Sequence, residues 1–208
     1  MTQQPTIPEF SRDDVELIER KTAWQGYYRM VVYRLRYRRF DGGWSNEIER
    51  EVFERGIAAA VVPYDPVRDE VVLIRQFRPG AYAAGMTPWL WEVVAGIIEP
   101  GETPLEVVTR EATEEAALAI ENPIRICQYL VSPGGTSEVC TLFCARVDSS
   151  EAGGIHGLAS ENEDIAVKAV PFAQVMQMLT DDLFNNAKTI IGLQWLALHR
   201  ERLRQNWA

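Results

Sequence analysis

Residues 96–118 read GIIEPGETPLEVVTREATEEAAL and carry the most informative pattern in this chain. The middle of the stretch has the composition of a helix start. Thr103 is suited to the N-cap, Pro104 to the first helical position and Glu106 to the third position of a capping box. The pattern therefore predicts a helix over residues 104–118.

Two glutamates of this helix, Glu111 and Glu115, are four residues apart and share one face. Two like charges at that spacing repel each other by roughly a few tenths of a kcal/mol in a bare helix. A hard divalent cation bound through oxygen ligands would offset the repulsion. A solvated acidic face is the ordinary interpretation of an isolated pair of glutamates.

The whole stretch fits the template G-x5-E-x7-R-E-U-x-E-E-x-G-U, in which U is aliphatic. It resembles the signature box of the Nudix hydrolases, which cleave nucleoside diphosphates linked to another moiety. Ala112 is small for its aliphatic position, and Ala117 stands where the family usually has glycine. The second departure falls at the helix end, where glycine often adopts a positive φ, so it concerns the local turn and not the carboxylates. The matching positions are Gly96, Glu102, Arg110, Glu111, Glu114, Glu115 and Leu118.

The resemblance implies a magnesium site of two or three ions, in which Mn²⁺ can substitute. By resemblance, Glu111 and Glu115 are the core metal ligands, and the backbone carbonyl of Ala95 is a third ligand. Gly96 would let its strand approach the ions closely. We expect Glu115 to lie on a helix face and not in the core.

The other charged positions of the box have supporting roles by the same resemblance. Glu114 supports the metal ligands or joins them. Arg110 and Glu102 hold the loop and the helix in place through a salt bridge.

Residues 148–162 are polar and glycine-rich, and they are expected to form a loop between two strands. The resemblance implies that Glu161 is the general base and that Glu163 is a metal ligand. Spacing alone does not separate the two roles, so they could be exchanged. His156 is an alternative base, although a loop histidine is more often structural or solvated.

Pro133 lies 15 residues beyond Leu118, a position that marks the ADP-sugar branch of the family. Glycines after it, including Gly134, would let backbone N–H groups meet a phosphate or ribose oxygen; a plain hairpin turn is the alternative. Guanidinium groups match phosphate oxygens, and tyrosine rings stack on adenine, for which Tyr28 is preferred. The remaining candidate substrate-binding residues are Tyr27, Tyr28, Arg50, Glu51, Arg55, Arg78, Ile97 and Glu138.

Two domains are expected. Residues 1–55 form a small antiparallel β domain for substrate binding and dimerisation, and residues 56–208 form the catalytic domain. No secondary-structure type is predicted for residues 13–19. The resemblance implies an α/β (α+β) fold, an α/β/α sandwich with a mixed sheet. Strands are expected over residues 27–40, 46–53, 57–64, 70–77, 90–95, 124–131, 139–147 and 165–170, and further helices over 172–179 and 187–202.

Composition excludes several classes of protein. The 208 residues carry a net charge of −9, which argues against a nucleic-acid partner. No apolar run is long enough to cross a membrane, and the N-terminus does not resemble a signal peptide. The three cysteines form no CxxC pattern and are expected to be reduced core thiols of a cytoplasmic protein.

The resemblance to the ADP-ribose pyrophosphatase branch covers nearly the whole chain. It implies hydrolysis of ADP-ribose to AMP and ribose 5-phosphate by a homodimer with exchanged N-terminal domains. A preference for another ADP-sugar, such as ADP-glucose, is the first alternative. A non-catalytic module that senses ADP-ribose is the second, and the intact carboxylates argue against it.

Overall fold

The computed structural model describes residues 7–207, without the side chain of Glu161, and divides into two compact units. Unit 1 comprises Met1–Gly56 and Leu130–Glu138, and unit 2 comprises Ile57–Tyr129 and Val139–Ala208. The expected boundary followed residue 55, and the N-terminal part of unit 1 ends at Gly56. The segment Leu130–Glu138 was expected in the catalytic domain, but it clusters with unit 1.

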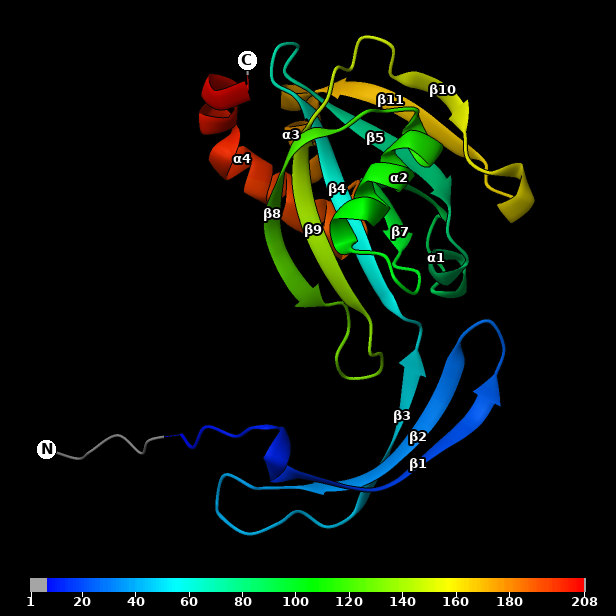
Figure 1. Ribbon diagram of the computed structural model, residues 1–208, viewed down its shortest axis with the longest axis vertical. Coiled ribbons are helices and arrows are strands. Elements are labelled where there is room, and N and C mark those ends of the chain that lie inside the picture. The colour runs from blue at the N-terminus through cyan, green and yellow to red at the C-terminus, as the bar shows by residue number, and fades with distance from the viewer. Residues whose placement is uncertain (1–6, 208) are drawn as a thin grey trace, which may run out of the picture. The chain divides into compact units, whose positions relative to one another are not determined.

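Unit 1 is built on a three-stranded antiparallel sheet, drawn in blue shades in Figure 1. After a 3₁₀ turn at Arg12–Asp14, the strands are β1 (Val15–Gln25), β2 (Arg29–Tyr37) and β3 (Ile48–Glu54). The segment that received no type from the sequence, residues 13–19, is divided between the end of this 3₁₀ turn and the start of β1. The pairing of β1 with β2 shifts register at two places, between Leu17 and Glu19 and between Thr22 and Trp24, and such bulges break the two-residue period by which strands are recognised.

The sheet of unit 1 buries little. Among its described residues Val31 alone is buried. The segment Leu130–Glu138 joins the end of β3 through main-chain bonds. Phe53 N–H donates to the Gly135 carbonyl (2.9 Å), and Ser137 N–H donates to the Phe53 carbonyl (3.2 Å).

Unit 2 contains a mixed eight-stranded sheet. The path runs β10-β11-β5-β4-β9-β8, with β6 paired to β5 and β7 paired to β4. Strands β4 and β9 are parallel, whereas β4, β5, β6, β7, β10 and β11 pair antiparallel. The strands are β4 (Ile57–Asp65), β5 (Glu70–Phe77), β6 (Trp89–Glu92), β7 (Val94–Ile97), β8 (Glu121–Leu130), β9 (Val139–Arg146), β10 (Gly153–His156) and β11 (Ile165–Pro171).

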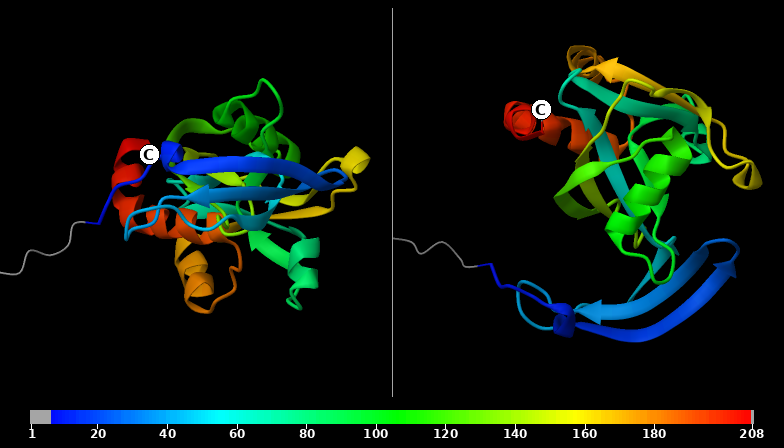
Figure 2. Two further views of the ribbon diagram at one scale, coloured as in Figure 1. Left: turned by 90° about the horizontal axis from the view of Figure 1, so that it is seen from below. Right: turned by 45° about the horizontal axis from the view of Figure 1, so that its top comes forward.

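Helices cover both faces of this sheet, as Figures 1 and 2 show for α2 in green and α4 in red. Alternate residues of β4 point to opposite sides. Ala60 and Val62 belong to the core cluster that includes residues of α3 (Phe172–Thr180) and α4 (Ala187–Trp207). Ala59 and Val61 belong to the cluster that includes residues of α2 (Pro104–Ala116). The expected α/β/α sandwich is confirmed.

Several boundaries differ from expectation. The strand expected over residues 90–95 is two strands, because the chain changes partner at Val93, leaving β5 for β4. The Val93 N–H, which leaves the ladder there, donates to Thr189 Oγ1 of α4 (3.0 Å). The supposed loop at residues 148–162 contains β10 and a 3₁₀ turn, and the short helix α1 (Pro79–Ala83) was not expected.

All three cysteines are reduced thiols. Cys140 and Cys144 are buried on the same face of β9, within the core cluster that α3 and α4 cover. Within residues 7–207 no helix is long and apolar enough to cross a membrane.

Candidate active site

The signature stretch brings strand β7 and helix α2 into close contact. A Cβ atom at Gly96 would collide with the carboxylate of Glu111, so the glycine leaves the space that this side chain occupies against the strand. One residue earlier on β7, the Ala95 N–H donates to Glu115 Oε2 (3.1 Å). Gly96 therefore lets two carboxylates of one helix face meet the backbone of a strand.

Glu115 is buried, with 2% of its surface exposed. The expectation that it lies outside the core was wrong, because α2 packs that face against the sheet. Burial raises the pKa of Glu115 to about 8, opposed by the Ala95 N–H and reinforced by the charges of Glu111 and Glu163. The structure thus holds a carboxylate where its charge is costly, and a bound cation would reduce that cost.

The pKa of Glu111 is also raised, although less than that of Glu115. Burial raises its pKa, and so do the charges of Glu114 and Glu163, whereas Arg110 lowers it. The Arg110 Nη1 group donates to Glu111 Oε1 at 2.8 Å. Glu111 therefore combines partial desolvation with one cationic partner.

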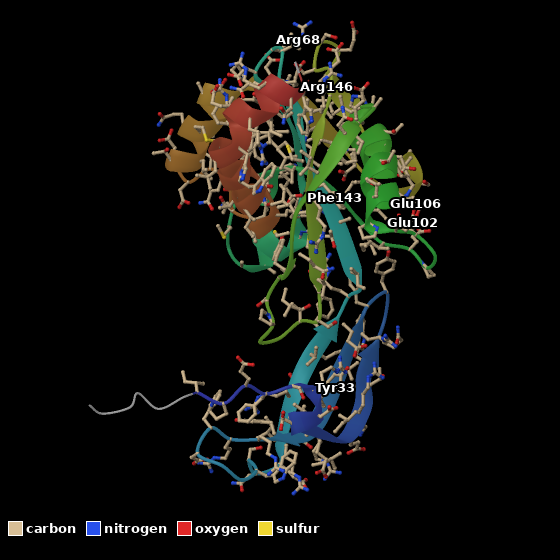
Figure 3. All side chains as sticks on the ribbon, turned by 60° about the vertical axis from the view of Figure 1, so that its left-hand side comes forward. Tyr33, Arg68, Glu102, Glu106, Phe143 and Arg146 are labelled. Carbon is tan, nitrogen blue, oxygen red and sulfur yellow. The ribbon has the colours of Figure 1, made fainter. Side chains whose placement is uncertain are left out.

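Arg110 also connects the helix to the preceding loop. Its Nε and Nη2 groups donate to the Glu102 carboxylate (3.0 and 3.3 Å), and its Nη1 group donates to Glu114 Oε2 (3.0 Å). The salt bridge expected between Arg110 and Glu102 is confirmed. Glu102 and Glu106 lie beside the start of α2 in Figure 3, and the capping box of Thr103 and Glu106 is formed.

The end of α2 accounts for the departure at Ala117. This residue has φ 52° and ψ 35°, the left-handed conformation that the usual glycine adopts without a steric penalty. The Leu118 N–H donates to the Ala112 carbonyl (2.9 Å), and the Ala117 N–H donates to the Thr113 carbonyl (3.0 Å). Ala117 therefore forms the left-handed turn at the end of α2 that glycine usually forms at this position.

The second acidic segment lies between β10 and β11. Gly157 has φ +101°, and a Cβ there would collide with Glu163. The Leu158 N–H donates to Glu163 Oε2 (3.1 Å), which fixes this carboxylate within its own loop. Glu161 ends the turn Ala159–Glu161, and its side chain lies outside the described part of the structure.

His156, the alternative base, is already engaged. Its Nε2 atom hydrogen bonds with the Gly153 carbonyl at 2.7 Å, within the same strand. This contact favours the structural interpretation of the histidine.

The donor atoms suit a magnesium ion. Glu111, Glu115 and Glu163 offer hard carboxylate oxygens, which Mg²⁺ prefers, and the charge of Glu163 acts on both helix carboxylates. In the described part of the chain no three acidic, imidazole or thiol side chains form a ready-made ligand set. These residues fit a divalent cation through their ligand type and charge, and not through a preformed arrangement of side chains.

Arg78, a candidate for substrate binding, lies at the end of β5 in unit 2. Its guanidinium is bound to the buried carboxylate of Glu92, which also meets Lys188. Burial by itself would raise the pKa of Glu92, but Lys188 and Arg78 hold it below the ordinary value. Sequence reasoning missed Glu92 and Lys188, although a glutamate after the apolar run WLW was a signal of a buried charge.

The remaining candidates divide between the units. Ile97 ends β7 in unit 2. In unit 1, Arg55 pairs with Glu138 (3.0 Å), and its guanidinium lies 5.4 Å from the centre of the Tyr28 ring. Tyr28 also meets Tyr27 edge-on, with ring centres 4.7 Å apart. Arg50 and Glu51 lie exposed on β3, and Pro133 and Gly134 lie exposed in the segment Leu130–Glu138.

Comparison with known proteins agrees with this geometry. The NUDIX domain model matches residues 54–192, which include β7, α2 and the acidic segment before β11. The chain belongs to the NUDIX family. Its Nudix box is thus the structure formed by Gly96, Arg110 and the glutamates around them.

Relatives extend the likeness over most of the chain. A protein named ADP-ribose pyrophosphatase from Escherichia coli K12 is 49% identical over 199 residues, which cover 96% of this chain and 95% of that protein. One of the same name from Haemophilus influenzae is 39% identical, covering 99% and 96%. GDP-mannose pyrophosphatase from Cronobacter sakazakii is 34% identical, covering 89% and 96%.

A solved structure described as an ADP compounds hydrolase shares the fold. Its TM-score is 0.69 at 22% identity, with 96% of this chain and 99% of that chain covered. Its similarity supports the fold described above and nothing beyond it.

Proposed function

We propose that this Nudix enzyme hydrolyses the diphosphate of ADP-ribose to AMP and ribose 5-phosphate. The observation that carries the proposal is the buried Glu115 beside Glu111, held against Ala95 and Gly96. That arrangement suits cleavage of a diphosphate, and the names of the relatives at 49% and 39% identity supply the substrate.

Glu111, Glu115, Glu163 and the Ala95 carbonyl are the proposed ligands of Mg²⁺, with Mn²⁺ as a substitute. When bound, the ions supply positive charge that stabilises the attacking oxygen, the leaving oxygen and the phosphate oxygens. The raised pKa values of Glu111 and Glu115 support this assignment, because a cation offsets the cost of their burial. The number of ions, two or three, is part of the proposal.

Glu161 is the proposed general base. It takes a proton from the water that attacks one phosphorus, and the bond from that phosphorus to the bridging oxygen breaks. Glu163, held by the Leu158 N–H, is assigned to the metal. The reverse assignment predicts that Glu163→Gln lowers kcat more than Glu161→Gln at saturating Mg²⁺.

Substrate recognition is assigned to two groups of residues. Arg78 and Ile97 of unit 2 contact the phosphates and the ribose. In unit 1 the tyrosines stack on the adenine and the arginines grip the diphosphate or ribose, and the contacts of Arg55 with Tyr28 and Glu138 support a common site for them. The proposed residues of unit 1 are Tyr27, Tyr28, Arg50, Glu51, Arg55, Pro133, Gly134 and Glu138.

We further propose that the enzyme is a cytoplasmic homodimer in which the N-terminal units are exchanged. The exposure of the three-stranded sheet of unit 1 supports the proposed dimer, because three strands with one buried residue do not form a stable core by themselves. The reduced cysteines support a reducing compartment. Sedimentation of a fully active monomer would contradict the dimer.

A substrate panel tests the function. ADP-ribose, ADP-glucose and GDP-mannose are each incubated with and without Mg²⁺, and a coupled phosphatase releases phosphate from the products. We expect the highest kcat/KM for ADP-ribose, and only with metal. A higher kcat/KM for ADP-glucose would select the other ADP-sugar, and no turnover of any member would overturn the enzyme assignment.

A further inference from the structure

A buried carboxylate outside the Nudix box has four nitrogen partners, which come from three residues. Glu92 of β6 is 2% exposed. Its Oε2 atom accepts from Arg78 Nε (2.9 Å) and Nη2 (2.7 Å) and from Gln76 Nε2 (3.4 Å), and its Oε1 atom lies 3.3 Å from Lys188 Nζ. One buried negative charge thus faces two positive charges, and removing it would leave both unpaired.

The start of helix α4 is fixed to the two residues that flank Glu92, Trp91 and Val93. Asn186 Nδ2 donates to the Trp91 carbonyl (3.0 Å), and Thr189 Oγ1 accepts from the Val93 N–H (3.0 Å). These bonds flank Glu92 and hold Lys188 opposite it. A lysine in the first turn of a helix is unfavourable with respect to the helix dipole. Glu92 compensates for that position.

Arg78 is partly exposed, and the carboxylate that binds it is buried. Its side chain is 37% exposed, whereas that of Glu92 is 3% exposed. Both bonds to Glu92 use Nε and Nη2, and neither uses Nη1. The charges of Glu115 and Glu163 also act on Arg78, so this guanidinium is attracted both to Glu92 and to the proposed metal ligands.

We propose that Glu92, backed by Lys188, is a positioning residue that holds Arg78 away from the metal carboxylates with Nη1 turned to an anionic diphosphate. Without this anchor Arg78 would pair with Glu115 or Glu163, which would weaken metal binding and substrate binding together. The proposal rests on the proposed function, in which Arg78 contacts the substrate.

The test uses Glu92→Gln in the full chain, with Asp69→Asn as matched control. Asp69 is another partly buried carboxylate of unit 2 that pairs with two arginines, Arg200 and Arg204. We expect Glu92→Gln to raise the KM for the substrate and the Kd for Mg²⁺, measured by calorimetry without substrate, each by about tenfold, the lower range for loss of an orienting group. We expect Asp69→Asn to lower Tm and leave both constants unchanged.

Two further variants separate positioning from stability. In a double-mutant cycle, Arg78→Lys should abolish most of the effect of Glu92→Gln on KM, because Arg78 transmits it. Glu92→Asp keeps the charge but shortens the side chain, so it should raise KM and leave the Kd for Mg²⁺ near that of the parent. If Glu92→Gln does not fold, the KM of Glu92→Asp still tests the positioning role.

Unchanged KM in both Glu92 variants, or independent effects of the Arg78 and Glu92 changes, would overturn the proposal. Failure of the parent enzyme to hydrolyse any member of the panel is a separate outcome. In that case a weaker Kd for Mg²⁺ in Glu92→Gln would support the positioning role and reject only the proposed function.

Discussion

The two units place their charged groups in different surroundings. In unit 1, charged side chains lie on a sheet that is mostly exposed, and several form surface pairs such as Arg36 with Glu16. In unit 2, Glu92 of strand β6 and Glu115 of helix α2 are buried between the sheet and the helices that cover it. A surface pair contributes little, whereas a buried carboxylate needs a partner. Unit 2 therefore holds its carboxylates in more deeply buried and energetically costlier positions than unit 1 does.

The largest effect is expected from Glu115→Gln in unit 2. Loss of a metal ligand should lower kcat/KM by at least about a hundredfold, since loss of an orienting partner alone costs about 10- to 100-fold. The assay is ADP-ribose hydrolysis at saturating Mg²⁺. Glu201→Gln, an exposed change on α4, is the control and should retain parent activity. Activity of the Glu115 variant within tenfold of the parent would contradict the ligand role.

The same carboxylate should destabilise the metal-free protein as pH rises. Below the unfolded pKa of about 4.5, Glu115 is protonated in both states and has no cost. Between that value and about 8, the unfolded chain ionises while the folded chain holds the proton, so stability falls with pH.

We expect the parent protein in EDTA to lose on the order of a few kcal/mol more than Glu115→Gln between pH 5 and pH 8.5. Thermal denaturation at both pH values measures the difference. Glutamine can still accept from the Ala95 N–H, so the variant isolates the charge. Parallel stability profiles of the two proteins would reject the raised pKa of Glu115.

In unit 1 one carboxylate, Glu54, connects all three strands. It accepts from Arg20 of β1 (2.9 and 2.7 Å) and from the hydroxyl of Tyr33 of β2, which Figure 3 labels. Glu54→Gln should lower the local stability of the sheet by about 1–2 kcal/mol. Hydrogen exchange should quicken in β1–β3 and stay unchanged in β4 and β9.

The surface variant Glu16→Gln is the matched control for Glu54→Gln. It removes an exposed pair with Arg36 and should change exchange in unit 1 by less than about 0.5 kcal/mol. Equal quickening in both units would show that they open together, against the contrast drawn above.

The smallest effect is expected at the end of α2. Ala117→Gly relieves a left-handed alanine and should stabilise the protein by about 0.5–1 kcal/mol. Ala116→Gly, one residue earlier inside the helix and buried, should instead destabilise it by about 1 kcal/mol or more. Chemical denaturation compares the two, and the same sign for both changes would contradict this account of the turn.

The sequence was sufficient where structure is local. The capping box of Thr103 and Glu106 and the salt bridge of Arg110 with Glu102 depend on residues within one helix and its flanks. The sequence left the turn at Ala117 in doubt, because alanine stands there in place of the usual glycine. Strand β5 was predicted with its observed bounds, because its apolar run is bounded by turn residues.

Features that depend on distant partners were not predictable. The burial of Glu115 depends on its contact with Ala95, 20 residues earlier. The break between β6 and β7 depends on Thr189, which is 96 residues from Val93. The resemblance named Ala95 as a metal ligand, but nothing local to the helix signals its bond to Glu115, and nothing local to Val93 signals Thr189. The carboxylates were therefore predicted by type and position, and their burial was not.

Unit 1 is built from two separate stretches of the chain, and this has a consequence for folding during synthesis on the ribosome. The Phe53 carbonyl accepts from the hydroxyl of Thr136, a residue 83 positions later in the chain. A nascent chain that has released only β1–β3 therefore lacks the segment that completes their sheet, and long loops close slowly. The first unit to emerge should be among the last to finish folding, with its bare strands open to misplaced pairing until residue 138 has left the tunnel.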